Sequence, residues 1–456
     1  MRLLIKNGTV VNSYGVHKAD VLAEGGQIVS VEPSLRADGA SVLDASGCYV
    51  FPGFIDPHTH FDLRLTTATT ADDFTSGTRA AILGGTTTIL DFATQDRGMT
   101  MHEALGIWHT RANKSSCNYG FHMALSEWND ALCAEMATMR EQGVTSYKLY
   151  MVYPALRVTD GELYGALKRA RELNALVSAH CENWELLQAM TSEQKAQGHF
   201  APFAHPLSRP AENEAEAVNR FLRLAELAEA PAYVVHLSTA EGLLAANMAR
   251  ARGQQVYLET CPQYLLLTDD RYQDADAGKF VMSPPLRKAS DNLALFAGLE
   301  NDLIDTVGTD HCSFTMAQKA QGAGDFTQIP NGSAGVQTRA ALYYTYGVIN
   351  GHLSLTQMAA QLSFNAARLF GMFPQKGLIA PGADADIVIW DPSHEETLCA
   401  KTLAHNCDNT PFAGMRVKGR ARDVLLNGEL VVQNGVLTQP GKGRYIQRGA
   451  PLFFRD

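Results

Sequence analysis

Several features that would mark particular classes of protein are missing from this sequence. Its eight cysteines form no C-x-x-C pair, and a chain of 456 residues does not need disulfide bonds to make up for a small core. No apolar run is long enough to span a membrane, and the start, MRLLIKNGTVVN, lacks the apolar core of a signal peptide. We therefore expect a cytoplasmic protein with reduced thiols and no membrane association.

Basic residues are too few for a nucleic-acid-binding protein. The 38 Lys and Arg are outnumbered by 48 Asp and Glu, and the net charge of -10 opposes contact with phosphates or with an anionic membrane surface. Charged residues make up only 19% of the chain and hydrophobic residues 46%, which is enough apolar material for a large buried core. The composition favours a small-molecule partner.

The two ends of the chain differ from its middle. Residues 1–52 and 375–440 carry short alternating strands broken by Asn-Gly or Gly-Gly pairs at 7–8, 25–26, 427–428 and 434–435. Such pairs are typical of antiparallel sheets, and Asn7-Gly8 in particular predicts a hairpin. The two segments can form one β-sandwich domain or two separate small caps, and both arrangements stay open. Residues 441–456 form a C-terminal tail.

The middle of the chain, residues 53–374, has the pattern of an α/β barrel. Short apolar runs recur there, each followed by room for a helix, and AENEAEAVNRFLRLAELAEA (211–230) has apolar residues near a 3.6 period. Eight such runs are the number that a (β/α)8 TIM barrel requires. The runs are GFIDPHTH, TTTILDFA, YGFHMALS, SYKLYMVY, LVSAHCEN, YVVHLST, VYLETCPQ and DTVGTDHC.

Six side chains that could serve as metal ligands lie on these runs, mostly near their ends: His58, His60, Lys148, His180, His236 and Asp310. The carboxyl ends of barrel strands converge on the face where catalytic groups are placed. Residues i and i+2 of an extended chain point to the same side, so the two imidazoles of H-x-H can reach one ion. We therefore expect the six side chains to meet at one mouth of the barrel.

Each of these residues also has a simpler explanation when it is taken alone. A His-x-His pair is more often incidental than a metal site, and His180 or His236 in isolation is more often a core histidine with satisfied hydrogen bonds. Asp310 could cap the following helix. The recurrence of such residues at matching positions of five runs is what favours metal binding.

Lys148 has two interpretations. A buried ammonium is costly and repels a metal ion, whereas a deprotonated amine that captures carbon dioxide becomes a carbamate with two oxygens able to bridge two cations. The alternative is a lysine whose amine reaches solvent at a strand end. His and carboxylate ligands suit two divalent ions, zinc above all, with manganese, cobalt and iron as alternatives. Such ions make bound water a nucleophile, and Asp310 would act as general base and then general acid.

Several segments together carry a resemblance to a known family. The segments GFIDPHTHF, GGTTTILDF, SYKLYM, AHCEN, VVHLS, ETCPQYL, SPPLR, GTDHC and KGLIAPGADADIVIWDP resemble those of the cyclic amidohydrolases, and among them the hydantoinase and dihydropyrimidinase family. The resemblance runs almost from end to end. It implies a barrel with a side sandwich built from both termini, and a homo-oligomer, a tetramer or a dimer.

The resemblance also assigns roles to individual residues. It implies that His58, His60, Lys148 and Asp310 bind one metal, and that Lys148 (as N6-carboxylysine), His180 and His236 bind the second. Tyr153 would donate a hydrogen bond to the oxyanion, although an ordinary amphipathic tyrosine is an equal alternative. Ser283 and Asn331 would hold the amide edge of the substrate ring, and Leu65, Tyr150 and Arg157 would form a gate for its exocyclic substituent.

The predicted reaction is the hydrolytic opening of a cyclic diamide, a hydantoin or dihydropyrimidine, to an N-carbamoyl amino acid. Two alternatives remain, an allantoinase-like ureide hydrolase and a non-catalytic scaffold of the same family. Dihydroorotases have an arginine two residues after the second histidine, where this chain has Asp62, which disfavours an acidic ring substrate. Gln337 stands where relatives commonly have glutamate, and its contact is left open.

Overall fold

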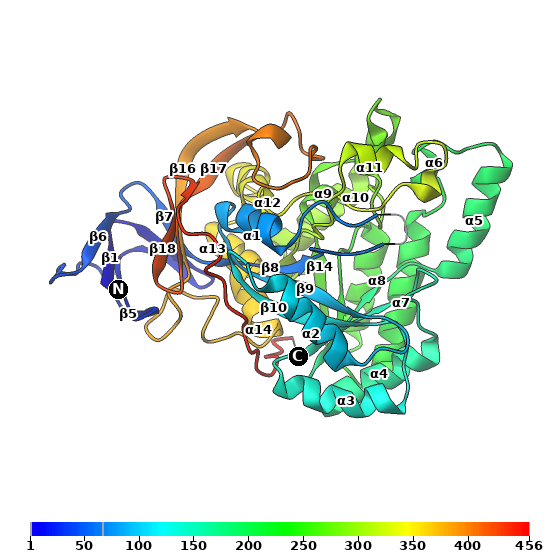
Figure 1. Ribbon diagram of the computed structural model, residues 1–456, viewed down its shortest axis with the longest axis horizontal. Coiled ribbons are helices and arrows are strands. Elements are labelled where there is room, and N and C mark those ends of the chain that lie inside the picture. The colour runs from blue at the N-terminus through cyan, green and yellow to red at the C-terminus, as the bar shows by residue number, and fades with distance from the viewer. Residues whose placement is uncertain (1, 66–67, 456) are drawn as a thin grey trace.

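The computed structural model describes residues 2–65 and 68–455. Figure 1 shows the terminal sheets on the left and a barrel surrounded by helices on the right. No helix among the described residues is both long enough and apolar enough to cross a membrane.

Eight parallel strands form the barrel in sequence order, as the eight apolar runs predict. An additional parallel bridge between Thr59 and His311 joins the last strand region to the first and nearly closes the barrel. The strands are β8 (Phe54–Thr59), β9 (Thr86–Gln95), β10 (Asn118–Leu125), β11 (Ser146–Tyr150), β12 (Leu176–His180), β13 (Ala232–Val234), β14 (Val256–Thr260) and β15 (Thr306–Val307).

Helices follow the strands, and local sequence explains where several of them begin. In α2 and α4 the N-terminal Thr100 and Thr159 form capping boxes with Glu103 and Glu162. The predicted helix at 211–230 is α7, which buries its apolar face. The helices are α1 (Phe74–Leu83), α2 (Met101–Ala112), α3 (Asp130–Glu141), α4 (Asp160–Glu172), α5 (Trp184–Ala196), α6 (Ala204–Leu207), α7 (Ala211–Leu227), α8 (Ala240–Ala251), α9 (Pro262–Leu266), α10 (Ala289–Glu300), α11 (Met316–Ala320), α12 (Arg339–Tyr343), α13 (Leu355–Ala359) and α14 (Asn365–Leu369).

The two chain ends form two sheets that pack together, so the sandwich is correct and the two separate caps are not. One sheet has the order β5-β4-β1-β6, and the other, β19-β18-β17-β16-β7-β2-β3, mixes strands from both ends. Their shared core includes Leu3, Ile5, Val21, Val50, Ile387 and Leu425. The strands are β1 (Arg2–Lys6), β2 (Thr9–Asn12), β3 (Gly15–Lys18), β4 (Asp20–Glu24), β5 (Gln27–Glu32), β6 (Ser41–Asp44), β7 (Tyr49–Pro52), β16 (Ile387–Thr397), β17 (Arg416–Leu426), β18 (Glu429–Gln433) and β19 (Val436–Leu437).

The hairpin predicted at Asn7-Gly8 is wrong. The strands on either side of it, β1 and β2, lie in different sheets, so this turn carries the chain from one sheet to the other. Asn7 has a φ of 64°, and a Cβ on Gly8 would lie 2.5 Å from Val50 Cγ2. Asn7 and Gly8 therefore form a tight turn that connects the two sheets. The pairs at 25–26, 427–428 and 434–435 do join antiparallel neighbours.

The C-terminal tail packs against the amino ends of the barrel strands. Tyr119 at the start of β10 donates its N–H to Arg444 O at 3.0 Å and accepts from Ile446 N at 2.8 Å. Buried Arg448 donates to Ser146 Oγ at 2.8 Å. The tail thus covers the end of the barrel opposite the predicted site. The limits at residues 52, 374 and 440 that separate the three parts stay predictions.

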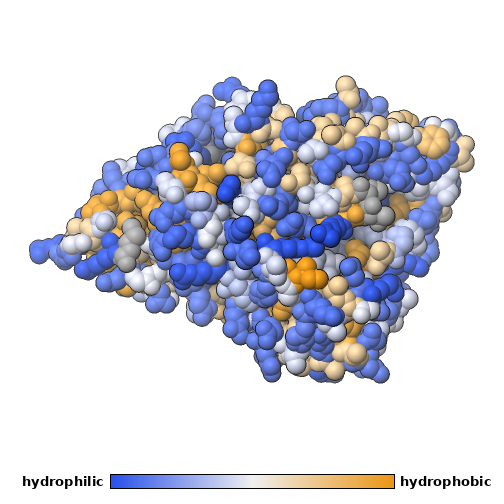
Figure 2. All heavy atoms as spheres, in the orientation of Figure 1, coloured by the Kyte–Doolittle hydropathy of each residue, from blue (hydrophilic) through white to orange (hydrophobic). Residues whose placement is uncertain are grey.

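In the view of Figure 2, hydrophobic residues are visible at the surface of the terminal sheets, on the left of the molecule. The exposed apolar residues of this region include Tyr14, Val16, Val29 and Val42. None of the six predicted metal ligands lies among these residues.

Candidate active site

All six predicted ligands lie at or near the carboxyl ends of barrel strands. Lys148 is inside β11, and His58 and His180 lie in the last two residues of β8 and β12. His236 and Asp310 follow β13 and β15 and have positive φ values of 39° and 52°. Non-glycine residues with positive φ are uncommon and cluster at functional sites.

Three of these residues form a compact group that could hold a metal ion, His58, His60 and Asp310. Asp310 Oδ1 lies 3.2 Å from His58 Nε2 and 3.1 Å from His60 Nε2. Ligand atoms of the three residues all lie within 4.8 Å of one another. Asp310 does not cap a helix, since α11 begins six residues later and is capped by Thr315.

The other two histidines meet beside this group. His180 Nδ1 and His236 Nε2 are 3.0 Å apart, and the rings of His236 and His58 are 5.4 Å apart. The His180 and His236 side chains come from neighbouring strands, which is why they converge. The four histidines therefore form one continuous cluster with Asp310.

Two buried glutamates that the sequence analysis did not single out orient the histidines. Glu259 in β14 lies 2.6 Å from His58 Nδ1 and accepts from the backbone N of His236 at 3.0 Å. Glu182 lies 2.6 Å from His180 Nε2 and is also bonded to Arg209 at 2.6 Å. These carboxylates favour the tautomers that leave His58 Nε2 and His180 Nδ1 free to bind metal. A charged residue within the apolar run VYLETCPQ was the available signal for Glu259.

Burial and the carboxylates pull the pKa values of the site in opposite directions. Burial lowers the pKa of His58, but Glu259 and Asp310 outweigh it and raise the pKa to about 9. Burial dominates at His60, whose pKa falls to about 4. Burial raises the pKa of Asp310, but the imidazoles of His58 and His60 hold it well below its usual value. Asp310 is therefore an anion, as a metal ligand requires.

Lys148 is buried against the aromatic rings of Phe92 and Tyr150. Its side chain is 1% exposed, and its Nζ is 5.1 Å from the centre of the Phe92 ring and 5.2 Å from that of Tyr150. No hydrogen bond or ion pair of this amine occurs among the described residues. Burial lowers its pKa to about 8, against the opposing effect of Asp310 and Glu259. The neutral amine is thus accessible near neutral pH.

Tyr153 lies beside His180, and Ser283 and Asn331 carry polar groups that are available to a ligand. Tyr153 has a φ of 73°, and its ring is 5.2 Å from that of His180. Ser283 Oγ and Asn331 Oδ1 are buried and have no hydrogen-bond partner in the described part of the chain. Asn331 also lines a cavity of about 340 Å³ together with Arg209 and Trp184. Buried polar atoms without partners are available to a ligand.

The three predicted gate residues lie in different environments. Tyr150 is buried, and its ring stacks at 6.1 Å from that of His180. Arg157 is partly exposed, pairs with Glu185 at 2.7 Å and lies 5.7 Å over the Trp184 ring. Leu65 donates its N–H to Ala68 O at 2.8 Å in the loop after β8. Residues 66 and 67 of that predicted loop lie outside the described residues.

Gln337, whose contact the sequence left open, binds a loop of the terminal domain. Its Oε1 accepts from the backbone N of Ala404 at 2.8 Å. A glutamate oxygen could accept the same bond, so this contact does not require the glutamine amide group.

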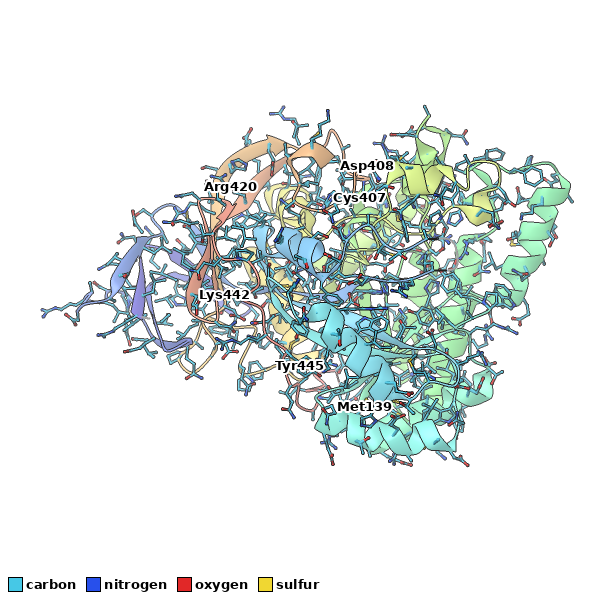
Figure 3. The ribbon with its side chains drawn as sticks, viewed as in Figure 1. Met139, Cys407, Asp408, Arg420, Lys442 and Tyr445 are labelled. Carbon is cyan, nitrogen blue, oxygen red and sulfur yellow. The ribbon has the colours of Figure 1, made fainter. Side chains whose placement is uncertain are left out.

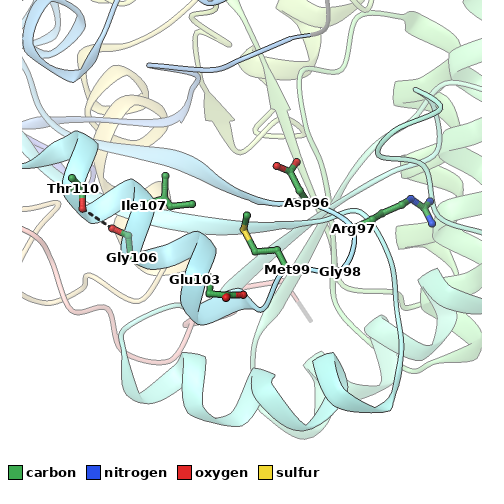
Figure 4. A pocket seen from close by; sticks show the side chains of 8 residues that line it. All are labelled: Asp96, Arg97, Gly98, Met99, Glu103, Gly106, Ile107 and Thr110. Atoms are coloured by element: carbon green, nitrogen blue, oxygen red, sulfur yellow. Dashed lines mark hydrogen bonds between the residues drawn. The ribbon is translucent and has the colours of Figure 1, made fainter.

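A second cavity, of about 680 Å³, lies beyond the end of β9 along α2 (Figure 4). It is lined by Asp96, Arg97, Gly98, Met99, Glu103, Gly106, Ile107 and Thr110. None of the predicted ligands or substrate contacts is among these residues, so it is separate from the histidine cluster.

Comparisons with known proteins agree with this geometry. The family profile described as "Amidohydrolase family" matches residues 49–431. The chain is 43% identical to a D-hydantoinase of Geobacillus stearothermophilus over 98% of this chain and 97% of the relative. It is 42% identical to a D-phenylhydantoinase of Escherichia coli over 98% of each chain. The crystal structure of a dihydropyrimidinase from Brevibacillus agri superposes with a TM-score of 0.97 and 42% identity, covering 99% of both chains.

Proposed function

Since this chain belongs to the amidohydrolase family, and matches its hydantoinase and dihydropyrimidinase members from end to end, we infer that it is a cyclic amidohydrolase. It opens the cyclic amide bond of hydantoins or dihydropyrimidines and gives N-carbamoyl amino acids. The observation that carries this inference is the cluster of His58, His60 and Asp310 at the mouth of a barrel shared with those relatives.

The donor set fits a pair of divalent metal ions, and we propose zinc. His58 Nε2 and His60 Nε2 converge on one carboxylate oxygen of Asp310, and two nitrogens of His180 and His236 face each other. Nitrogen lone pairs directed at one another or at a carboxylate are favourable only with a proton or a cation between them. The proposed first site is His58, His60, Lys148 and Asp310, and the second is Lys148, His180 and His236. Bound ions would lower the pKa of a water and polarise the attacked carbonyl.

We propose that Lys148 carries a carboxylate on its amine. The neutral amine nitrogen forms a bond to the carbon of CO2, one C=O π bond opens to place negative charge on oxygen, and the nitrogen releases one proton to water, so that a neutral amine becomes an anion. The low pKa and the absence of a polar partner within the described residues support this reaction, because the neutral amine is the reactive form. The carbamate would then supply a bridging ligand to the cluster of histidines and Asp310.

The remaining residues have proposed roles in binding and proton transfer. Ser283 and Asn331 hold the amide edge of the ring, using groups that have no hydrogen-bond partner among the described residues. Tyr153 donates a hydrogen bond to the carbonyl oxygen, which becomes negative as water attacks. Asp310 accepts a proton from the attacking water and returns it to the ring nitrogen as the C–N bond breaks.

The gate residues suggest how substituents are accommodated. We propose that Tyr150 contacts the substituent close to the ring, because it is buried beside His180. Leu65 and Arg157 contact it further out, and the ion pair with Glu185 keeps Arg157 at the rim. An apolar or aryl substituent suits contact with Leu65 and Tyr150.

The test is the hydrolysis of hydantoin, 5-phenylhydantoin, dihydrouracil and allantoin, measured before and after chelation. We expect turnover of the first three compounds, loss of turnover on metal removal, and recovery with zinc. A preference for allantoin would move the assignment to the ureide hydrolases. Activity that survives complete metal removal, or no turnover at two metals per chain, contradicts the proposal.

We also propose that the enzyme is a cytoplasmic homo-oligomer, a tetramer or a dimer. Large apolar side chains on α8 and α10 support a protein interface, since Leu244, Met248 and Leu293 are each more than half exposed, at 59%, 57% and 69%. Light scattering coupled to size-exclusion chromatography measures the subunit count. A monomer at micromolar concentration would contradict this part of the proposal.

A further inference from the structure

Asp72 is a fully buried carboxylate at the end of the loop that follows β8. Its Oδ1 accepts from Ser76 Oγ and from the backbone N of Asn406, each at 2.7 Å. Its Oδ2 accepts from Ser313 Oγ at 2.6 Å and lies 3.2 Å from His311 Nε2. Four donors use the whole acceptor capacity of a carboxylate. Asp72 therefore joins its own segment, which includes Ser76, to two segments far from it in the sequence, one with His311 and Ser313 and one with Asn406.

The His311 ring is held in one orientation and one tautomer. Its Nδ1 accepts from the backbone N–H groups of Gly335 and Val336, at 3.1 and 3.2 Å. The ring proton is consequently on Nε2, which donates to Asp72. The ring cannot exchange these roles without losing both bonds at Nδ1.

His311 touches the predicted metal ligands through its backbone. It directly follows Asp310, whose φ is 52°, and its carbonyl oxygen accepts from His60 N at 2.8 Å. The backbone that carries Asp310 and the backbone that carries His60 are thus both attached to one residue. A shift of the His311 backbone would therefore move two of the three groups in the His-His-Asp cluster.

The fourth donor to Asp72 comes from the terminal domain. Asn406 belongs to the connection between β16 and β17, which reaches from the terminal sheet toward the barrel mouth (Figure 1). Figure 3 labels Cys407 and Asp408, the two residues that follow Asn406 in this connection. Asp408 Oδ1 there accepts from Met316 N at 2.8 Å, at the start of α11.

We propose that Asp72 is a positioning residue that connects the terminal domain to the metal centre, through the N–H of Asn406 on one side and the ring of His311 on the other. The inference rests on the proposed function. Asp72 touches neither substrate nor metal ligand side chains; it sets where Asp310 and His60 lie. The terminal domain is then part of the catalytic apparatus, because it supplies one of the four bonds that hold Asp72.

The substitution Asp72→Asn tests this connection. The asparagine oxygen can replace only one carboxylate oxygen, and the NH2 group must face the other pair of donors. The serine hydroxyls can turn and accept, but the N–H of Asn406 and the Nε2–H of His311 cannot. In Asp72→Asn the new NH2 group must therefore face either the N–H of Asn406 or the Nε2–H of His311, and neither of these donors can accept a hydrogen bond. Asn406→Pro removes one of those donors and should relieve the conflict, because the oxygen can then face His311.

The experiment compares four variants with the zinc-loaded wild type: Asp72→Asn, Asn406→Pro, the double variant, and Asn406→Ala, which keeps the N–H. Each is measured for kcat and KM on hydantoin and, after metal removal, for its affinity for Co2+. We expect Asp72→Asn to lower kcat and Co2+ affinity about 10- to 100-fold with KM changed less than about twofold. Asn406→Pro should cause a smaller loss, Asn406→Ala none, and the double variant should recover to near Asn406→Pro.

Each result decides the proposal. Values for Asp72→Asn within about twofold of wild type, or a double variant whose loss is the product of the single losses, overturn it. If circular dichroism shows that Asp72→Asn does not fold, the comparison of Asn406→Pro with Asn406→Ala tests the proposal instead. Equal Co2+ affinities of these two variants would overturn the proposal. An inactive wild type would instead contradict the proposed function, while the affinities would still test the connection.

Discussion

Replacing Lys148 by methionine should abolish activity and yet stabilise the metal-free protein. The Lys148 amine is buried, has no polar partner among the described residues, and has a pKa of about 8 against an ordinary value of 10.5. Keeping it protonated in the folded protein at neutral pH therefore costs about 3 kcal/mol. Methionine is unbranched and apolar, and fills a similar volume without that cost.

The sign of the pH dependence follows from the two pKa values of Lys148. Between about pH 8 and pH 10.5 the unfolded chain binds more protons at this site than the folded one, so stability rises with pH. The penalty is complete below pH 8 and disappears as the pH approaches 10.5. The advantage of Lys148→Met should be about 3 kcal/mol at pH 6.5 and about 1 kcal/mol at pH 9.5.

The assay is urea denaturation of chelator-stripped protein in buffer free of CO2, so that the amine stays unmodified. Lys168→Met, at an exposed position in α4, is the matched control and should change stability by less than about 0.5 kcal/mol at either pH. A Lys148→Met protein no more stable than wild type at pH 6.5, or an advantage independent of pH, would refute the reasoning. Activity and metal content of the same variant should both be lost.

Three further changes separate the roles of other residues. Tyr153→Phe should lower kcat about 100-fold while two metals per chain remain, as steady-state kinetics and elemental analysis would measure; an unchanged kcat would exclude a hydrogen bond to the oxyanion. Glu259→Gln should weaken metal binding about 10- to 100-fold, because His58 loses its charged partner, and chelator competition would detect the change. Arg157→Ala should leave the rate on hydantoin within about twofold and alter only the rates on bulky 5-substituted substrates, and its exposed ion pair contributes less than about 1 kcal/mol. Equal effects on small and bulky substrates would remove Arg157 from the gate.

Patterns within short segments predicted much of the site. H-x-H on an extended strand places His58 and His60 on one side, and the ends of parallel strands meet, so the convergence of the histidines and Asp310 followed from local reasoning. The same reasoning failed at Asn7-Gly8, because a left-handed Asn-Gly turn fits a hairpin and a crossing between sheets equally well. Sheet membership depends on β4, β6 and β7, which are distant in sequence.

The residues that orient the ligands were harder to predict. Glu259 is 201 positions from His58, and Asp72 lies 334 positions from Asn406. No periodicity links residues so far apart, and a glutamate in a strand is indistinguishable from one that faces solvent until its neighbours are known. Glu182, two residues from His180, was nearer, but its bond depends on where the chain turns after β12.

By itself, the sequence determined the eight strands, the helices between them, and the side chains proposed to bind metal, because strand and helix periodicities and ligand chemistry are local properties. Only the tertiary structure decided which carboxylate meets which imidazole, how the two termini share a core, and how the terminal domain reaches Asp72. Those contacts arise from packing between distant segments, where burial removes water and makes each unpaired donor or acceptor costly.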